Sequence, residues 1–128
     1  MACGWCGARI SLCRLFDHDQ PYFLQLEDGR IIFAIPYERD FTLIGTTDVD
    51  HEGDAEAAAC SNDERDYLIA AASSFFRSGI SRDDIVTTFS GVRPLYDDGA
   101  SSASAATRDY VLTCEDEGGA AALVNVFG

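Results

Sequence analysis

The sequence Tyr22-Phe-Leu-Gln-Leu26 is followed by the turn Glu27-Asp-Gly29 and then by Arg30-Ile-Ile-Phe-Ala-Ile35. Aromatic and β-branched residues favour strands, and Asp28-Gly29 is a strong signal for a tight hairpin turn. A second turn over residues 37–40 leads to another strand-like run at residues 41–47. The sequence therefore predicts an antiparallel meander of three strands. Because apolar residues fall on both of its faces, we expect both faces to be covered.

A helix is predicted after this meander. Ser61-Asn-Asp-Glu64 matches a capping box, and the helix is expected to run to about residue 77, before Gly79. The stripe expected to face the core consists of Tyr67, Leu68, Ala71, Ala72, Phe75 and Phe76. Further strands are predicted at residues 85–89, 108–114 and 121–127. The expected fold class is α+β, with an antiparallel sheet flanked by helices.

Two arginines are expected to come together: Arg93 follows the fourth predicted strand, and Arg108 begins the fifth. Arg93 belongs to Ser90-Gly-Val-Arg-Pro-Leu95, in which Pro94 favours an extended conformation of the residue before it. Arg108 follows an acidic loop of small residues. Paired guanidinium groups suit a phosphate or a carboxylate, which they bind with parallel hydrogen bonds. With 22 acidic residues in the chain, surface salt bridges are an equally good interpretation on spacing alone.

Composition limits the partners of the chain. Its 128 residues fit one domain, and the net charge is −13, with no lysine. This charge argues against nucleic acid and against anionic membrane surfaces. No apolar run reaches the ~20 residues of a membrane helix, and the first residues do not resemble a signal peptide.

The five cysteines do not indicate a disulfide framework or a metal centre. Their number is odd, and no signal sequence accompanies them. Cys3-Gly-Trp-Cys6 is a single C-x-x-C without a second ligand pair, which zinc requires. A small metal or redox protein is therefore the weakest of the alternatives.

Four motifs together resemble a known family. They are Gly45-Thr-Thr-Asp-Val-Asp50, Ser81-Arg-Asp-Asp-Ile-Val86, Ser90-Gly-Val-Arg-Pro-Leu95 and Thr107-Arg-Asp-Tyr110. In order and spacing, from about residue 15 to residue 128, they are similar to the FAD-dependent glycerol-3-phosphate dehydrogenases. The resemblance implies the substrate-binding (cap) domain of a D-amino-acid-oxidase-like flavoprotein. It implies that Arg93 and Arg108 bind the substrate and that Gly91 and Val92 lie beside the flavin.

The same resemblance implies an activity. Such enzymes oxidise sn-glycerol 3-phosphate to dihydroxyacetone phosphate and pass electrons from FAD to a quinone; a related oxidase uses oxygen. They are cytoplasmic and peripheral to the inner membrane. The glycine-rich FAD-binding loop and the active-site lysine of the family are not in this chain. We therefore expect the chain alone to be inactive. The alternative is a stand-alone anion-binding or interaction module.

The first residues depart from the family. Where the family has a strand resembling Leu-Val-Arg-Gly-Ser-His-Ile-Val-Val-Pro, this chain has Trp5-Cys-Gly-Ala-Arg-Ile-Ser-Leu-Cys-Arg14. Codons for the second sequence, read one base earlier, can spell the first. The hypothesis is that residues 1–14 are a frame-shifted segment, followed by a truncated substrate-binding domain at residues 15–128. We expect a segment of this origin to pack poorly.

Overall fold

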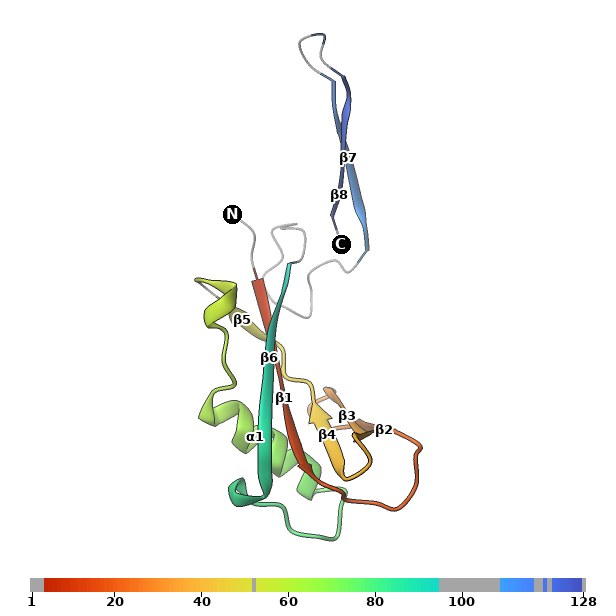
Figure 1. The fold of residues 1–128 in the computed structure, drawn as a ribbon, viewed down its shortest axis with the longest axis vertical. Helices are drawn as coiled ribbons and strands as arrows, with labels where there is room; N and C mark the ends of the chain where they lie inside the picture. The colour runs from red at the N-terminus through yellow and green to blue at the C-terminus, as the bar shows by residue number, and fades with distance from the viewer. Residues whose placement is uncertain (1–3, 52, 95–108, 117–118, 120, 128) are drawn as a thin grey trace.

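The computed structural model describes residues 4–51, 53–94, 109–116, 119 and 121–127. Its main body is an antiparallel sheet of six strands with one α-helix against it (Figure 1). These strands are β1 (Gly4–Cys13), β2 (Tyr22–Gln25), β3 (Ile31–Tyr37), β4 (Phe41–Gly45), β5 (Val49–His51) and β6 (Ile85–Pro94). The helices are α1 (Asn62–Ser73) and the short 3-10 turns η1 (Ala55–Ala57) and η2 (Arg82–Asp84). None of the helices in these residues is long and apolar enough to cross a membrane.

Strand β1 is the centre of the sheet. It pairs along one edge with β4 and β5 and along the other with nearly all of β6. The side chains of Ile10 and Leu12 are fully buried. The expectation that residues 1–14 pack poorly is therefore wrong for the part of the segment that is described. Ala8, Ile10 and Leu12 supply the alternating apolar residues of a strand, and strand hydrogen bonds come from the backbone, whatever the side chains are.

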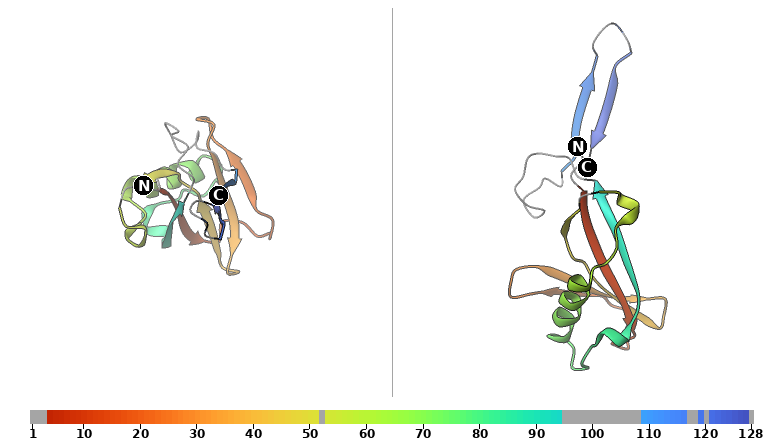
Figure 2. Two further views of the ribbon diagram at one scale, coloured as in Figure 1. Left: turned by 90° about the horizontal axis from the view of Figure 1, so that it is seen from above. Right: turned by 90° about the vertical axis from the view of Figure 1, so that its left-hand side faces the viewer.

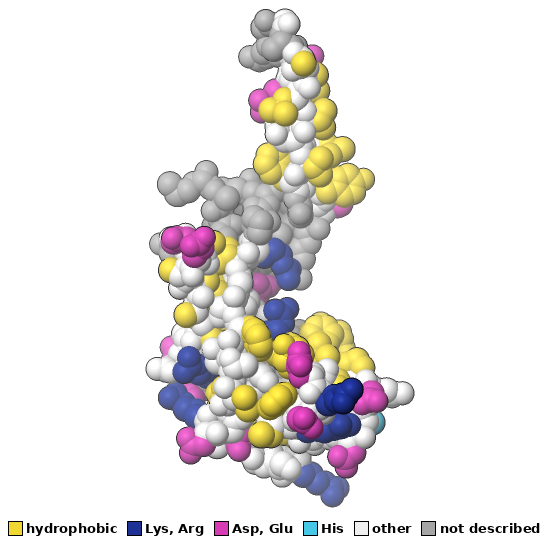
Figure 3. Space-filling view, in the orientation of Figure 1, with side chains coloured by type: hydrophobic (Ala, Val, Ile, Leu, Met, Phe, Trp, Pro, Cys, Tyr) yellow, Lys and Arg dark blue, Asp and Glu magenta, His cyan; other side chains and the backbone are white. Residues whose placement is uncertain are grey.

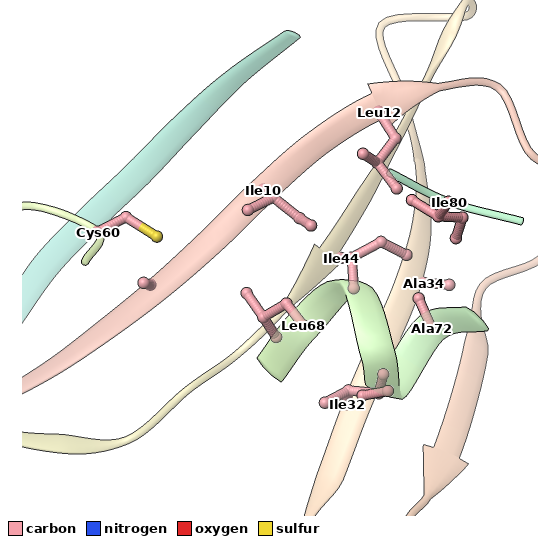
Figure 4. Close-up of a cluster of buried hydrophobic side chains, with 11 residues drawn as sticks. Ile10, Leu12, Ile32, Ala34, Ile44, Cys60, Leu68, Ala72 and Ile80 are labelled. Atoms are coloured by element: carbon pink, nitrogen blue, oxygen red, sulfur yellow. The ribbon is translucent and has the colours of Figure 1, made fainter. Parts of the chain in front are cut away.

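One face of the sheet is covered by α1, and the core lies between them (Figure 4). Its buried members from β1, β3 and β4 are Ala8, Ile10, Leu12, Ile32, Ala34 and Ile44. Leu68, Ala71 and Ala72 of α1 pack on them, as the predicted stripe requires. Phe75 is the exception, because it is exposed beyond the end of the helix. In the described residues no element covers the other face, so the expectation of two covered faces is confirmed for one only.

The meander and the helix match their predictions apart from their ends. Five residues join β2 and β3; within them Leu26 N donates to Arg30 O (2.8 Å), which closes the predicted turn at residues 27–29, and Gly29 takes a φ of 82°. The helix begins with the predicted capping box of Ser61 and Glu64. It ends at Ser73, well before residue 77, where the hydroxyl of Ser74 donates to Ala71 O (2.7 Å). Serine hydroxyls compete in this way with helical backbone bonds.

The last two strands form a hairpin of their own. Strands β7 (Val111–Glu115) and β8 (Leu123–Phe127) pair with each other and lie outside the six-stranded sheet. Figures 1 and 2 show the hairpin extending away from the sheet. Apolar side chains on it are exposed, namely Leu112, Leu123, Val124 and Val126. The predicted strands at residues 108–114 and 121–127 are confirmed with shifted ends.

Candidate functional site

The sheet face opposite α1, here called the open face, carries an apolar patch. Its exposed members are Phe23, Ile31, Phe33, Ile35 and Phe89, with exposed fractions between 38% and 62%. Figure 3 shows hydrophobic side chains gathered over the sheet, with basic side chains beside them. A contiguous exposed apolar patch on a protein often marks a binding site or an interface with another molecule.

A row of aligned residues crosses the open face through four pairs of strands. Phe89 of β6 is opposite Arg9 of β1, Arg9 is opposite Gly45 of β4, and Phe33 of β3 connects Gly45 with Phe23. Directly opposed residues in antiparallel strands point to the same face. A Cβ atom at Gly45 would lie 2.6 Å from Cγ of Arg9. The absence of a side chain at Gly45 therefore gives room for the stem of Arg9.

A strip without side chains lies next to this row. Gly7 of β1 is opposite Gly91 of β6, and the pair is here called the glycine gap. Among the described residues, a Cβ at Gly91 would meet nothing within 4 Å, so this part of the chain leaves the space above it open. A Cβ at Gly7 would lie 2.8 Å from Oγ1 of Thr46, so a hydroxyl group borders the other half. The gap thus allows another molecule to approach the sheet backbone closely.

Arg93 follows the glycine gap on β6. It is exposed, extended as its place before Pro94 predicts, and on the same face as Gly91 by strand alternation. Val92 is half-buried and opposite Cys6, so its side chain lies on the covered face. Arg108 lies outside the described residues. Among the described strands β7 pairs with β8 rather than with β6, so the expected meeting of Arg93 and Arg108 stays a prediction.

Arg9 lies on the open face but was not considered at the level of sequence. Its signal was present, because Arg9 alternates with the apolar residues Ala8 and Ile10 and so must point away from the core. The assumption that this segment packs poorly removed it from consideration.

The model of the family described as FAD dependent oxidoreductase (DAO) matches residues 8–128. The chain belongs to the FAD-dependent oxidoreductase family. The match begins within residues 1–14, so it includes part of the segment for which a shifted reading frame was inferred.

Relatives within this family are similar over nearly the whole chain. The aerobic glycerol-3-phosphate dehydrogenase of Escherichia coli (strain K12) is 48% identical over 122 residues, which are 95% of this chain and 24% of the relative. The D-erythritol 1-phosphate dehydrogenase of Brucella abortus (strain 2308) is 47% identical, with the same coverage. The chain thus spans 24% of the length of these relatives.

A solved structure of the family has the same arrangement. The crystal structure of the glycerol-3-phosphate dehydrogenase from Bacillus halodurans, complexed with FAD, matches with a TM-score of 0.66 and 34% identity. The match covers 73% of this chain and 19% of that protein. The antiparallel sheet with few helices is therefore that of a D-amino-acid-oxidase-like flavoprotein.

The open face fits the cofactor of this family. A flavin ring system is flat and largely apolar, and it needs a surface with little relief. Phe89 and Phe33 supply exposed apolar area, and the space above Gly91 leaves the sheet backbone accessible. The expectation that Gly91 and Val92 lie beside the flavin stays a prediction; Gly91 is exposed on the open face, and the side chain of Val92 lies on the covered face.

The motif beginning at Gly45 fixes the sheet to the helix. The hydroxyl of the buried Thr47 accepts a hydrogen bond from Ala8 N (2.9 Å) and donates one to Oε1 of Glu64 (2.6 Å). The other oxygen of Glu64 accepts bonds from the backbone N and the hydroxyl of Ser61 (both 2.8 Å). One carboxylate therefore connects β1, the segment after β4 and the N-terminus of α1.

These contacts change the ionisation of Glu64. Burial acts to raise its pKa, but the hydrogen bonds from Thr47 and Ser61 outweigh burial and hold the pKa below the usual value. A carboxyl group whose pKa is lowered by folding stabilises the protein above its unfolded pKa, and this contribution is lost as pH falls.

We therefore expect the free energy of unfolding to decrease as the pH falls below about 4.3, the ordinary value for glutamate. Urea denaturation at pH 7 and pH 3 measures the decrease, which is expected to be smaller in Glu64→Gln than in the parent chain. Glu27→Gln, in the exposed turn after β2, is the matched control and should retain the parental pH dependence. An equal decrease in Glu64→Gln and the parent would contradict the assignment.

The buried thiols do not form a nucleophilic centre. Burial and the charge of Glu64 raise the pKa of both Cys6 and Cys60, which keeps them protonated. In residues 4–51, 53–94 and the described parts of the hairpin, no three His, Cys, Asp or Glu side chains are placed to hold a metal ion. Cys3 lies outside the described residues, and with it half of the C-x-x-C motif.

Proposed function

We propose that this chain is the substrate-binding (cap) part of an FAD-dependent dehydrogenase that oxidises sn-glycerol 3-phosphate to dihydroxyacetone phosphate. The observation that carries the proposal is the position of Arg93, exposed on the open face next to the glycine gap. A substrate bound there meets a fixed cation and an accessible stretch of backbone. The identity to dehydrogenases of glycerol 3-phosphate and of erythritol 1-phosphate supports a polyol phosphate as the substrate class.

The charge of the chain makes a local cation necessary. With a net charge of −13, the protein as a whole repels a phosphate that carries nearly two negative charges. A planar guanidinium group binds two phosphate oxygens at once, which an ammonium group cannot do. Within the described residues Arg93 takes no part in an ion pair, so its guanidinium group is available. In this proposal Arg108 is the second substrate contact.

When bound, the flavin would supply the hydride-accepting chemistry that this chain's residues cannot provide. The residues of this chain bind and orient. Arg93 holds the phosphate, Gly91 lets the substrate and ring approach the sheet, and Phe89 contributes to the apolar surface that excludes water. Transfer of electrons to a quinone completes the proposed reaction.

A chimaera tests the function. Residues 8–128 replace the matching segment of the E. coli relative, and dye reduction is measured with glycerol 3-phosphate and with erythritol 1-phosphate. We expect a yellow, flavin-loaded protein that reduces the dye with glycerol 3-phosphate. A chimaera that binds flavin but oxidises neither substrate, while the unmodified relative is active, would contradict the proposal.

A further inference from the structure

We propose that Arg9 is a second phosphate-binding residue of this site, reaching the glycine gap from the side opposite Arg93. The inference rests on the proposed function of the open face and adds to it a residue on the central strand. It concerns the charge that this chain presents, whatever the origin of its first residues.

The register places the two arginines symmetrically about the gap. Arg9 is two positions beyond Gly7 on β1, and Arg93 is two positions beyond Gly91 on the antiparallel strand β6. Two strand positions correspond to about 6.6 Å, so each arginine begins about one side-chain spacing from the gap, at opposite ends. The stem of Arg9 lies over Gly45 of β4, and Oγ1 of Thr46 lies over Gly7, so the open part of the gap is at Gly91. The Arg9 side chain is long and flexible enough to turn from Gly45 toward Gly91.

The surroundings leave Arg9 available for a ligand. Its stem lies against Gly45, where any larger residue would collide with it. Three described arginines have acidic partners on this chain: Arg14 with Asp19, Arg30 with Asp28, and Arg82 with Asp66. In the described part of the chain, Arg9 and Arg93 form no such pair, as is also true of Arg39, Arg65 and Arg77, and both are exposed. What distinguishes Arg9 and Arg93 is their position on the open face, on either side of the open position at Gly91.

Electrostatics favours two cations over one at this place. Asp50 of β5 and Arg93 of β6 both align with Trp5 of the strand between them, which puts about two strand spacings, or roughly 10 Å, between their backbones. A negative charge at that distance opposes a bound phosphate. A second guanidinium group offsets Asp50 and offers the remaining phosphate oxygens charge-assisted hydrogen bonds. The hydroxyl of Thr46 borders Gly7 but donates its hydrogen bond to Thr47 O (2.9 Å), so the donors at this place are the two guanidinium groups.

Binding to the full chain tests the inference. Glycerol 3-phosphate and inorganic phosphate are titrated into the ¹⁵N-labelled chain, with glycerol as the uncharged comparison, and backbone amide shifts give Kd. We expect Arg9→Gln to raise Kd for both phosphates about tenfold, the effect of losing one charge-assisted contact. Arg9→Lys should recover part of the loss, because it restores the charge without the planar fork. Glycerol should bind to no variant.

Arg77→Gln is the matched control. Arg77 is exposed after the end of α1, and its substitution changes the net charge by the same amount. It should leave Kd unchanged, and an equal rise in Kd for Arg77→Gln and Arg9→Gln would reduce the effect to net charge and overturn the inference. The fold of Arg9→Gln is checked by thermal unfolding, and a melting temperature equal to that of the parent chain shows that the fold is retained.

The Arg93→Gln variant separates the two proposals. If Arg93→Gln weakens phosphate binding and Arg9→Gln does not, the inference about Arg9 is wrong and the proposed function stands. If both substitutions weaken binding, both proposals are supported. If neither substitution changes Kd, or the unmodified chain binds neither phosphate, the open face is not the phosphate site and both proposals fail.

Discussion

Arg93→Ala is expected to lower kcat/KM for glycerol 3-phosphate by roughly two to three orders of magnitude in the chimaeric dehydrogenase. In the proposed function, the phosphate and the guanidinium group form a charge pair that the bound cofactor and substrate shield from water. Removing one partner of such a pair typically costs about 3–5 kcal/mol, because the other charge is left without compensation. Steady-state kinetics of the single variants measures the effect.

Two further variants define the role of Arg93. Arg93→Lys should recover only part of the activity, because an ammonium group does not make two parallel hydrogen bonds to phosphate. Arg77→Ala, which changes the net charge equally, should retain near-parental kcat/KM. If Arg93→Ala keeps near-parental efficiency while Arg108→Ala does not, Arg93 is not the principal anion contact.

Ile10→Ala is expected to lower the free energy of unfolding of the chain by about 2–5 kcal/mol. Ile10 is fully buried at the centre of β1, between β4 and β6 and under α1. Truncating it removes apolar contacts and leaves a cavity, which the paired backbones on both sides cannot easily close. Urea denaturation followed by circular dichroism measures the change.

Phe23→Ala is the control for this prediction. Phe23→Ala removes more carbon atoms than Ile10→Ala, but the Phe23 side chain is 62% exposed on the open face. The loss of unfolding free energy should therefore stay below about 1 kcal/mol. Hydrogen exchange gives a second measurement, with strong protection expected at the amides of Ile10 and Leu12. A loss of less than about 1 kcal/mol for Ile10→Ala would show that β1 is not part of the stable core.

The meander and the capped helix were predictable because local signals determine them. Asp28-Gly29 specifies a turn, Ser61 with Glu64 begins a helix, and alternating apolar residues define strands. The end of α1 at Ser73 was harder to predict, because serine at residues 73 and 74 lowers helix propensity without preventing a helix. Such boundaries depend on small differences between competing hydrogen bonds.

The site was predictable in part. Arg93 and Gly91 were proposed as site residues from their motif; the structure places both on the open face, and their roles stay predictions. Arg9 was not identified, because its partners Gly45 and Phe89 are distant in sequence and strand pairing between them cannot be read from local patterns. The shifted reading frame proposed for residues 1–14 stays a prediction, and the nucleotide sequence of this region tests it.

The pairing of β1 with β6 has a consequence for the order of events during synthesis. Strand β1 is made first, yet the partner along one of its edges is β6, which follows α1 in sequence. The hairpins joining β2, β3 and β4 close over short loops and can form while later residues are still being added. One edge of the central strand can pair with β4 early, but the other edge must wait until β6 has left the ribosome. Such long-range pairings slow folding, so the last step of assembly is expected to be the slow one.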